Sequence, residues 1–196
     1  MQGIGAARVA PDQGGDVVDG TFMPVLRMAG AGDVAALAAL KRTTFRETFL
    51  EDFAIPYPPA DIAVFEAETY GVARVAQELG DAEHATWVVE GADGALLAYA
   101  HVGPCKLPHG DVTPGEVELY QIYVRRSGQG LGLGKRLLAA VMAHLAGAPR
   151  VWLGVWSGNV KAQAFYAARG FRQVGGYQFA VGDWLDDEFI YRFDRA

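Results

Sequence analysis

A glycine-rich segment is the clearest anion-binding candidate in the sequence. The run Gln129-Gly130-Leu131-Gly132-Leu133-Gly134-Lys135 follows an apolar stretch typical of a strand and opens a stretch typical of an amphipathic helix. The start of a helix has unpaired N–H groups and a partial positive charge, and glycines let the backbone approach a phosphate closely. Glycines at alternate positions would expose successive N–H groups to a diphosphate, and Lys135 or Arg136 would add positive charge.

Two common phosphate loops do not match this segment. A P-loop requires glycine where the chain has Gln129, and Ser or Thr where it has Arg136. A dinucleotide fingerprint that begins at Gly130 requires glycine at Lys135, and one that begins at Gly128 requires glycine at Leu133. A glycine-rich connection without any ligand is the remaining structural alternative.

A second motif follows further along the chain and favours a ligand-binding role for the glycine-rich segment. The strand-like run Val151–Trp156 precedes Asn159, then the helical pattern Ala162-x-x-Phe165-Tyr166, and then Gly170-Phe171. Together with the spacing Gln129-x-x-Gly132-x-Gly134, this order resembles that of the GNAT acetyltransferases. Within that family the details resemble bacterial polyamine (spermidine/spermine) acetyltransferases, through Thr44–Phe49 and through Phe179, Gly182, Asp183 and Asp187.

The resemblance implies an α/β (α+β) fold, with a mixed, largely antiparallel central sheet flanked by helices. It also implies an acetyl-CoA-dependent N-acetyltransferase of class EC 2.3.1, which transfers an acetyl group to a primary amine such as a polyamine or another small amine. Two alternatives stay open, namely a protein or peptide amine as acceptor and a non-catalytic acyl-CoA-binding module. GNAT proteins are often dimers, so a homodimer is compatible with the resemblance.

The resemblance also carries site residues onto this sequence. The residues expected to hold acetyl-CoA are Ile122, Tyr123, Val124, Gln129, Gly130, Leu131, Gly132, Leu133, Gly134, Lys135, Asn159 and Tyr166. Ile122 and Val124 would act through their backbone, because in GNAT proteins this strand splays from the next one. Asn159 would contact the pantetheine arm, or cap the last helix, or do both.

Two residues are predicted to be catalytic. The implied reaction is direct attack of a neutral amine on the thioester in a ternary complex, which requires a proton to leave the amine. Glu118 is the predicted base, with a solvent-facing strand carboxylate or a water chain as alternatives. Tyr166 is the predicted acid that protonates the departing thiolate, while Phe165 is expected in the core. Phe45, Phe49 and Tyr57 are equally compatible with the acceptor pocket and with the core.

The periodicity of the chain predicts the elements that position these residues. Residues 1–22 are expected to form a flexible arm, and residues 23–196 a single domain. The expected helices span 33–50, with Asp33 as N-cap, 59–79 with a break at Gly71, 133–145 and 159–169. The expected strands span 23–28, 85–90 and 95–102 as a hairpin, 116–124, 151–156, 172–181 and 187–193.

Composition excludes several other functions. The formal net charge of −6 argues against nucleic-acid binding, which requires a basic face. Cys105 is the single cysteine, so no intramolecular disulfide can form, and it is expected to be a bystander. The four histidines lack metal-ligand spacing, so no metal is expected. The chain has no apolar run of membrane-spanning length and no basic, apolar leader, which predicts a cytoplasmic protein.

Overall fold

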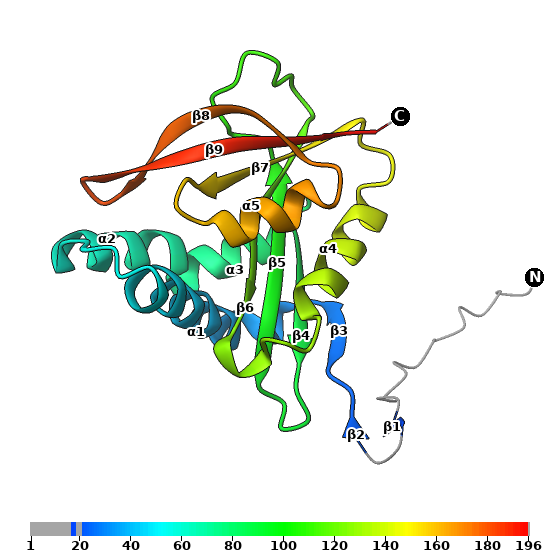
Figure 1. Ribbon diagram of the computed structural model, residues 1–196. Coiled ribbons are helices and arrows are strands. Elements are labelled where there is room, and N and C mark those ends of the chain that lie inside the picture. Colours follow the sequence, from blue (N-terminus) through cyan, green and yellow to red (C-terminus); the bar gives the residue numbers. More distant parts are fainter. Residues whose placement is uncertain (1–16, 19–20, 196) are drawn as a thin grey trace, which may run out of the picture.

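The computed structural model describes residues 17–18 and 21–195, and it is built around a seven-stranded sheet (Figure 1). The strand order is β3-β4-β5-β6-β7-β9-β8, in which β6 and β7 are parallel and all other neighbours are antiparallel. The strands are β3 (Val25–Met28), β4 (Ala85–Glu90), β5 (Leu96–Pro104), β6 (Val117–Val124), β7 (Arg150–Trp156), β8 (Arg172–Val181) and β9 (Trp184–Asp194). The predicted mixed, largely antiparallel sheet is therefore confirmed.

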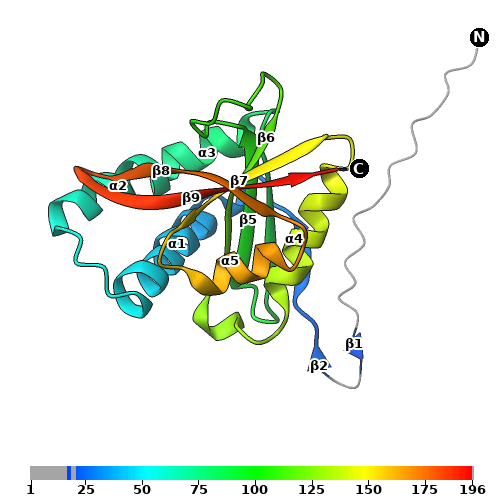
Figure 2. The ribbon, with the colours of Figure 1, turned by 45° about the horizontal axis from the view of Figure 1, so that its top comes forward.

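Five α-helices accompany this sheet in the described part of the chain (Figure 2). They are α1 (Val34–Phe45), α2 (Pro59–Tyr70), α3 (Val72–Gly80), α4 (Leu133–His144) and α5 (Val160–Ala167). Shorter helical segments are η1 (Ala31–Asp33), η2 (Arg46–Asp52) and η3 (Arg126–Gly128). Strands β1 (Val17–Val18) and β2 (Thr21–Phe22) form a separate antiparallel pair, and the rest of the predicted arm, residues 1–16 and 19–20, lies outside the described residues.

Alternation along the strands separates two cores on opposite faces of the sheet. On β4, Trp87 and Val89 belong to the cluster packed under α4, whereas Val88 packs with α1 and α3. On β5, Ala98 and Ala100 face the α4 side, whereas Tyr99 faces the α1 side. Successive strand residues point to opposite faces, so this half of the sheet is covered by helices on both sides, as its apolar strands require.

Strand β6 has an extra residue that changes this alternation. Val102 lies opposite Leu119 and His101 lies opposite Gln121, so Tyr120 has no partner on β5 and forms a β-bulge. Before the bulge Leu119 packs toward α4, and after it Ile122 and Val124 do so. As a result the opposite face of β6 presents Glu118, Tyr120, Gln121 and Tyr123, two of which are consecutive residues.

Helix α1 and its continuation differ in part from the sequence prediction. The first helix is α-helical only to Phe45 and continues to Asp52 as the π-helical segment η2. Asp33 stands at the predicted N-cap position, but its side chain does not cap α1. It accepts hydrogen bonds from Arg27 and from the Gly30 N–H, because a bidentate guanidinium is the stronger partner.

The predicted break between α2 and α3 is confirmed at Gly71. Its backbone is extended (φ −62°, ψ 145°), and a Cβ atom at this position would lie 2.5 Å from the Ala67 carbonyl oxygen. The second helix also begins where the sequence predicts it, with Pro59 in the first turn, where a missing N–H costs nothing. Within the described residues, no helix is long and apolar enough to span a membrane.

Candidate active site

The sheet opens between β6 and β7, and this opening creates the main cavity. The two strands pair only at Val117 with Val151 and at Glu118 with Trp152, after which no ladder joins them. The far edge of β7 remains paired with β9 along its whole length. The splay expected of Ile122 and Val124 is thus present, and a cavity of about 460 Å³ lies in the gap.

The glycine loop presents unpaired backbone donors at the start of α4. Gly130 and Gly132 have φ angles of +82° and +72°, which side-chain-bearing residues rarely adopt. The N–H groups of residues 130–134 have no hydrogen-bond acceptor among the described residues, whereas those of Lys135 and Arg136 donate to the Gly132 carbonyl. This arrangement fits an anionic diphosphate, because it combines oriented donors with the positive end of a helix dipole.

The loop is fixed from both sides. A Cβ atom on Gly128 would lie 3.2 Å from Leu133 and 3.3 Å from Val124, so the turn packs tightly onto the end of β6. The Arg126 N–H donates to the Glu47 carboxylate at 2.8 Å, and its guanidinium pairs with Glu51 and Asp52 of η2. Arg126 is therefore occupied by carboxylates, and no described carboxylate forms an ion pair with Lys135, so Lys135 is free to face an anion.

Asn159, at the N-cap of α5, and Tyr166, within α5, both line the cavity. The Asn159 Oδ1 atom accepts a hydrogen bond from the Ala162 N–H at 3.0 Å, which confirms its predicted role as N-cap and leaves its amide N–H₂ unused. The Tyr166 ring packs at the edge of the α4 core, and its hydroxyl has no hydrogen-bond partner among the described residues. Burial raises the pKa of this phenol, so it stays protonated.

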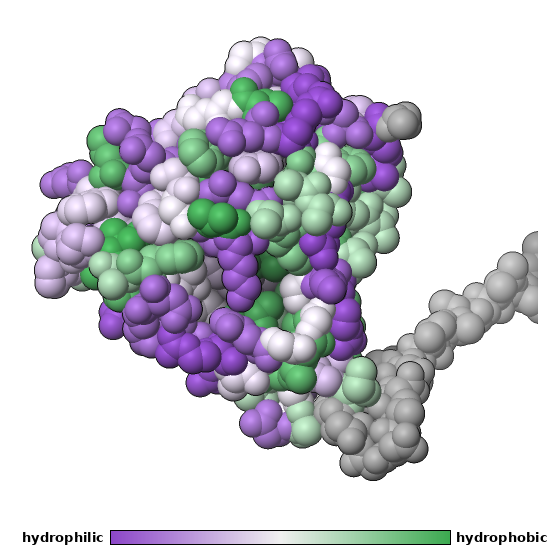
Figure 3. All heavy atoms as spheres, in the orientation of Figure 1, coloured by the Kyte–Doolittle hydropathy of each residue, from purple (hydrophilic) through white to green (hydrophobic). Residues whose placement is uncertain are grey.

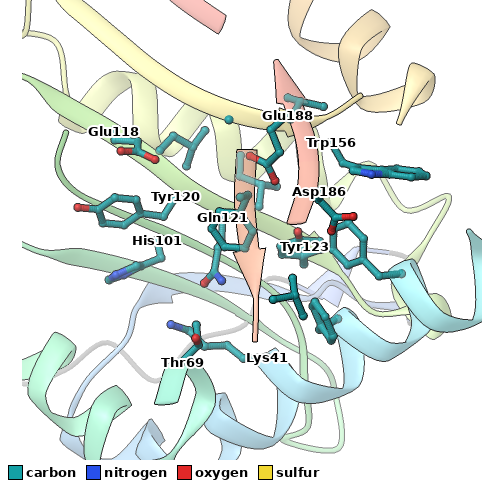
Figure 4. Close-up of a pocket in the computed structure, with 18 of the residues that line it drawn as sticks. Lys41, Thr69, His101, Glu118, Tyr120, Gln121, Tyr123, Trp156, Asp186 and Glu188 are labelled. Carbon is teal, nitrogen blue, oxygen red and sulfur yellow. The ribbon is translucent and has the colours of Figure 1, made fainter. Parts of the chain in front are cut away.

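Glu118 lies in the cavity wall and is not the solvent-facing carboxylate of the alternative reading (Figure 4). It is 7% exposed, and its Oε2 atom accepts a hydrogen bond from the Lys106 N–H at 2.9 Å. Its other oxygen has no partner among the described residues. Burial raises the pKa of Glu118 to about 7, which places its ionisation near neutral pH.

Glu188 of β9 is a cavity residue that the sequence prediction missed. Its Oε2 atom accepts a hydrogen bond from the Tyr177 hydroxyl at 2.6 Å, and burial raises its pKa to about 7. A Cβ atom on Gly154 of β7 would lie 2.5 Å from this oxygen and 2.7 Å from the Tyr177 oxygen. Gly154 therefore leaves the room that this pair occupies. No local sequence signal marks Glu188, because it reaches the cavity only through the pairing of β9 with β7.

Aromatic side chains form another part of the wall. Phe45, Phe49 and Tyr57 line the cavity and also belong to a buried cluster, which confirms their predicted place in the core. Trp156 packs against Phe53 with ring centroids 4.7 Å apart and also lines the cavity. Near the middle of one face, hydrophobic surface lies inside a hollow bordered by hydrophilic groups (Figure 3).

A buried polar cluster contains two of the histidines. Nδ1 of His101 lies 2.7 Å from the Thr86 hydroxyl, and its Nε2 lies 3.2 Å from Nδ1 of His84. Burial, reinforced by the positive charge of Lys41, lowers the pKa of His101 to about 3, so its imidazole is neutral. Among the described residues, no group of three or more His, Cys, Asp or Glu side chains is arranged to hold a metal ion.

Comparison with known proteins agrees with this geometry. Residues 34–171 match the model of the acetyltransferase (GNAT) family. The chain belongs to this family. An uncharacterised N-acetyltransferase of Mycobacterium bovis is 34% identical over 169 residues, which are 83% of this chain and 96% of the relative. A spermine/spermidine N(1)-acetyltransferase of Bacillus subtilis is 31% identical over 90 residues, which are 44% of this chain and 59% of the relative.

A solved structure supports the GNAT fold. PaiA N-acetyltransferase from Thermoplasma acidophilum, in complex with coenzyme A, superposes with a TM-score of 0.67, at 19% identity over 89% of this chain and 100% of that chain. The family assignment confirms the predicted N-acetyltransferase activity, for which acetyl-CoA is the family's acetyl donor.

Proposed function

We propose that this GNAT enzyme acetylates the primary amine of a small molecule by direct attack on acetyl-CoA in a ternary complex. One observation carries the proposal. The opening between β6 and β7 brings Glu118, Asn159 and Tyr166 around one cavity, and the unpaired donors of residues 130–134 begin just beyond the end of β6. The enzyme would take acetyl-CoA, the family's acetyl donor, from the cytoplasmic pool, so we place the enzyme in the cytoplasm.

Binding of the donor is assigned to the backbone. The N–H groups of residues 130–134 hold the pyrophosphate, and Lys135 adds charge. The unused amide N–H₂ of Asn159 donates to the pantetheine arm, and the open edge of β6 at Ile122 to Val124 continues the same track. A backbone N–H on this edge stabilises the negative charge that develops on the acetyl oxygen.

Proton transfer is assigned to side chains. An alkyl amine carries a proton at neutral pH, so a base must remove it before the nitrogen attacks the acetyl carbon. Glu118 accepts this proton, and its pKa of about 7 suits a base that works near neutral pH. When the carbon–sulfur bond breaks, the Tyr166 hydroxyl gives its proton to the sulfur, since it faces the cavity without another partner. The acetylated nitrogen then releases its surplus proton, which restores the tyrosine.

The acceptor is proposed to bind as a cation before it loses its proton. Glu118 and Glu188 each have one carboxylate oxygen fixed by a protein donor and one oxygen without a partner among the described residues. The aromatic rings of Phe45, Phe49 and Tyr57 lie in the same wall and attract a cation through their faces. A polyamine is one acceptor of this kind, as the name of the Bacillus subtilis relative indicates for that protein.

Two measurements test this proposal together. Isothermal calorimetry is expected to show acetyl-CoA binding to the wild-type protein and no binding to Gly132→Glu, because a carboxylate would occupy the diphosphate site. A thiol-release assay across small primary amines is expected to show turnover. If wild-type protein fails to bind acetyl-CoA at millimolar concentration, or binds it without acetylating any small amine in the panel, the proposal is wrong.

A further inference from the structure

A cluster of charged residues forms the part of the cavity opposite the two glutamates. Lys41 comes from α1, while Arg74 and Glu78 come from consecutive turns of α3, and all three line the cavity. Figure 4 shows Lys41 across the pocket from Glu118 and Glu188. The cavity therefore has an acidic part and a second charged part, and an acceptor that fills it touches both.

This second part carries an excess of positive charge. Lys41 Nζ donates to Glu78 Oε2 at 2.8 Å, and Arg74 Nε donates to Glu78 Oε1 at 2.9 Å. A single carboxylate thus balances two cations, one of which, Lys41, is only 2% exposed. The neighbouring His101 interacts through its neutral imidazole and adds no negative charge. Glu78 compensates the buried Lys41, and the second positive charge, on the 40%-exposed Arg74, leaves the group with a net positive charge that attracts an additional anion.

Two further residues of the cavity wall can contact an anion placed beside this group. Lys106 lines the cavity with its ammonium group 4.9 Å from the centre of the Tyr120 ring, and no described carboxylate forms an ion pair with it. Gln121 projects toward Lys41 (Figure 4), its Nε2 atom donates to the Tyr70 hydroxyl at 3.5 Å, and its buried oxygen has no hydrogen-bond partner among the described residues. An amide group can turn to present its N–H₂, so Gln121 can donate to an anion beside Lys41.

We infer that the acceptor carries an anionic group, a carboxylate or a phosphate, which binds beside Lys41, Arg74 and Gln121 while its amine lies between Glu118 and Glu188. The inference rests on the proposed function and narrows its substrate class to anionic primary amines such as amino acids. The second ammonium group of a polyamine would instead meet Lys41 and Arg74, whose shared carboxylate is already bonded on both oxygens. Like charges placed together in this way select against a partner.

Matched acceptors test this inference directly. Linear primary amines of two to five carbons would be compared in sets that differ only at the far end, which carries a carboxylate, a phosphate, a methyl group or a second amine. The measurement is kcat/KM for thiol release at saturating acetyl-CoA. We expect the best anionic acceptor to exceed its diamine counterpart by about tenfold or more, as one charge-assisted hydrogen bond implies. The carboxylate and phosphate sets distinguish the two sources of the anion.

A variant separates the role of the cluster from general effects. Arg74 is 40% exposed, so Arg74→Gln is expected to fold, and it should lower the anionic-to-diamine ratio of kcat/KM by at least about fivefold. Arg172→Gln removes an exposed arginine that pairs with Asp194, and it should leave the ratio unchanged.

Three results would overturn the inference. One is a diamine that equals or exceeds every anionic acceptor, and another is a ratio that Arg74→Gln leaves intact. In both cases an amine is still acetylated, so the proposed function would survive. The third is acetyl-CoA binding without acetylation of any acceptor in the panel, which removes the proposed function and this inference with it.

Discussion

Glu118→Gln is expected to inactivate the enzyme and, at the same time, to stabilise it at alkaline pH. The carboxyl group of Glu118 is buried in the cavity wall, and its pKa rises from the ordinary 4.5 to about 7. In the folded chain the group therefore keeps its proton at pH values at which the unfolded chain has lost it. Such a group lowers the stability of the fold as the pH rises from about 4.5, and its full cost is present above about pH 7.

The size of this effect follows from the same shift. A rise from 4.5 to about 7 corresponds to about 3 kcal/mol of free energy, as an upper value, because water in the cavity reduces the cost of the charge. Glutamine keeps the shape of the side chain and can still accept the hydrogen bond from the Lys106 N–H. At pH 8 the free energy of unfolding of Glu118→Gln should therefore exceed that of the wild type by about 1–3 kcal/mol, and the variant should unfold at a higher denaturant concentration. At pH 4.5 the two proteins should unfold at nearly the same denaturant concentration.

Urea unfolding at pH 4.5 and pH 8, together with kcat/KM from pH 5 to 9, would measure both effects. The wild-type rate should rise with pH to a plateau above about pH 7, and the variant should lose most of the rate over the whole range. Glu68→Gln, which changes an exposed carboxylate of α2, is the matched control and should alter neither measurement. A Glu118→Gln protein with no gain in stability at pH 8, or with the wild-type pH profile, would refute the reasoning.

Two further substitutions examine the other cavity groups. Tyr166→Phe removes only a hydroxyl group, so we expect turnover to fall by about 10²- to 10⁴-fold while acetyl-CoA affinity, measured by calorimetry, changes little; unchanged turnover would remove Tyr166 from the acid role. Gly154→Ala places a methyl group 2.5 Å from a Glu188 oxygen, so the carboxylate must move. We expect KM for the acceptor to rise several-fold with acetyl-CoA affinity retained, and an unaffected KM would argue that Glu188 does not touch the acceptor.

Much of the fold could be predicted because its signals are local. The apolar spacing of α4, the break at Gly71 and the hairpin of β4 and β5 depend on residues that are close in sequence, and each is present at about the expected position. The first helix shows the limit of this reasoning. Its apolar pattern continues to Leu50, but the backbone becomes π-helical after Phe45, and hydrophobic spacing alone does not distinguish the two helical forms.

The site was only partly predictable for a similar reason. The glycine loop and the Asn159–Tyr166 motif are continuous in sequence, so their types and spacing could be recognised. Glu188, Gly154 and the Lys41 cluster come together only through the sheet and through the packing of α1 against α3. No short-range pattern indicates such contacts. Asp33 shows that local signals can also compete, because a good capping residue binds Arg27, a stronger partner six residues earlier in the chain.

The bulge at Tyr120 determines which side chains of β6 face the cavity. Because of this single added residue, the side chains of β6 that face the cavity are every second residue as far as Tyr120, and the alternation then begins again at Gln121. If β6 alternated regularly from Leu119 onward, without the bulge, Gln121 and Tyr123 would instead turn toward α4 and the apolar Ile122 would turn into the cavity. The bulge is therefore a determinant of what the enzyme can bind, as much as the identity of any side chain.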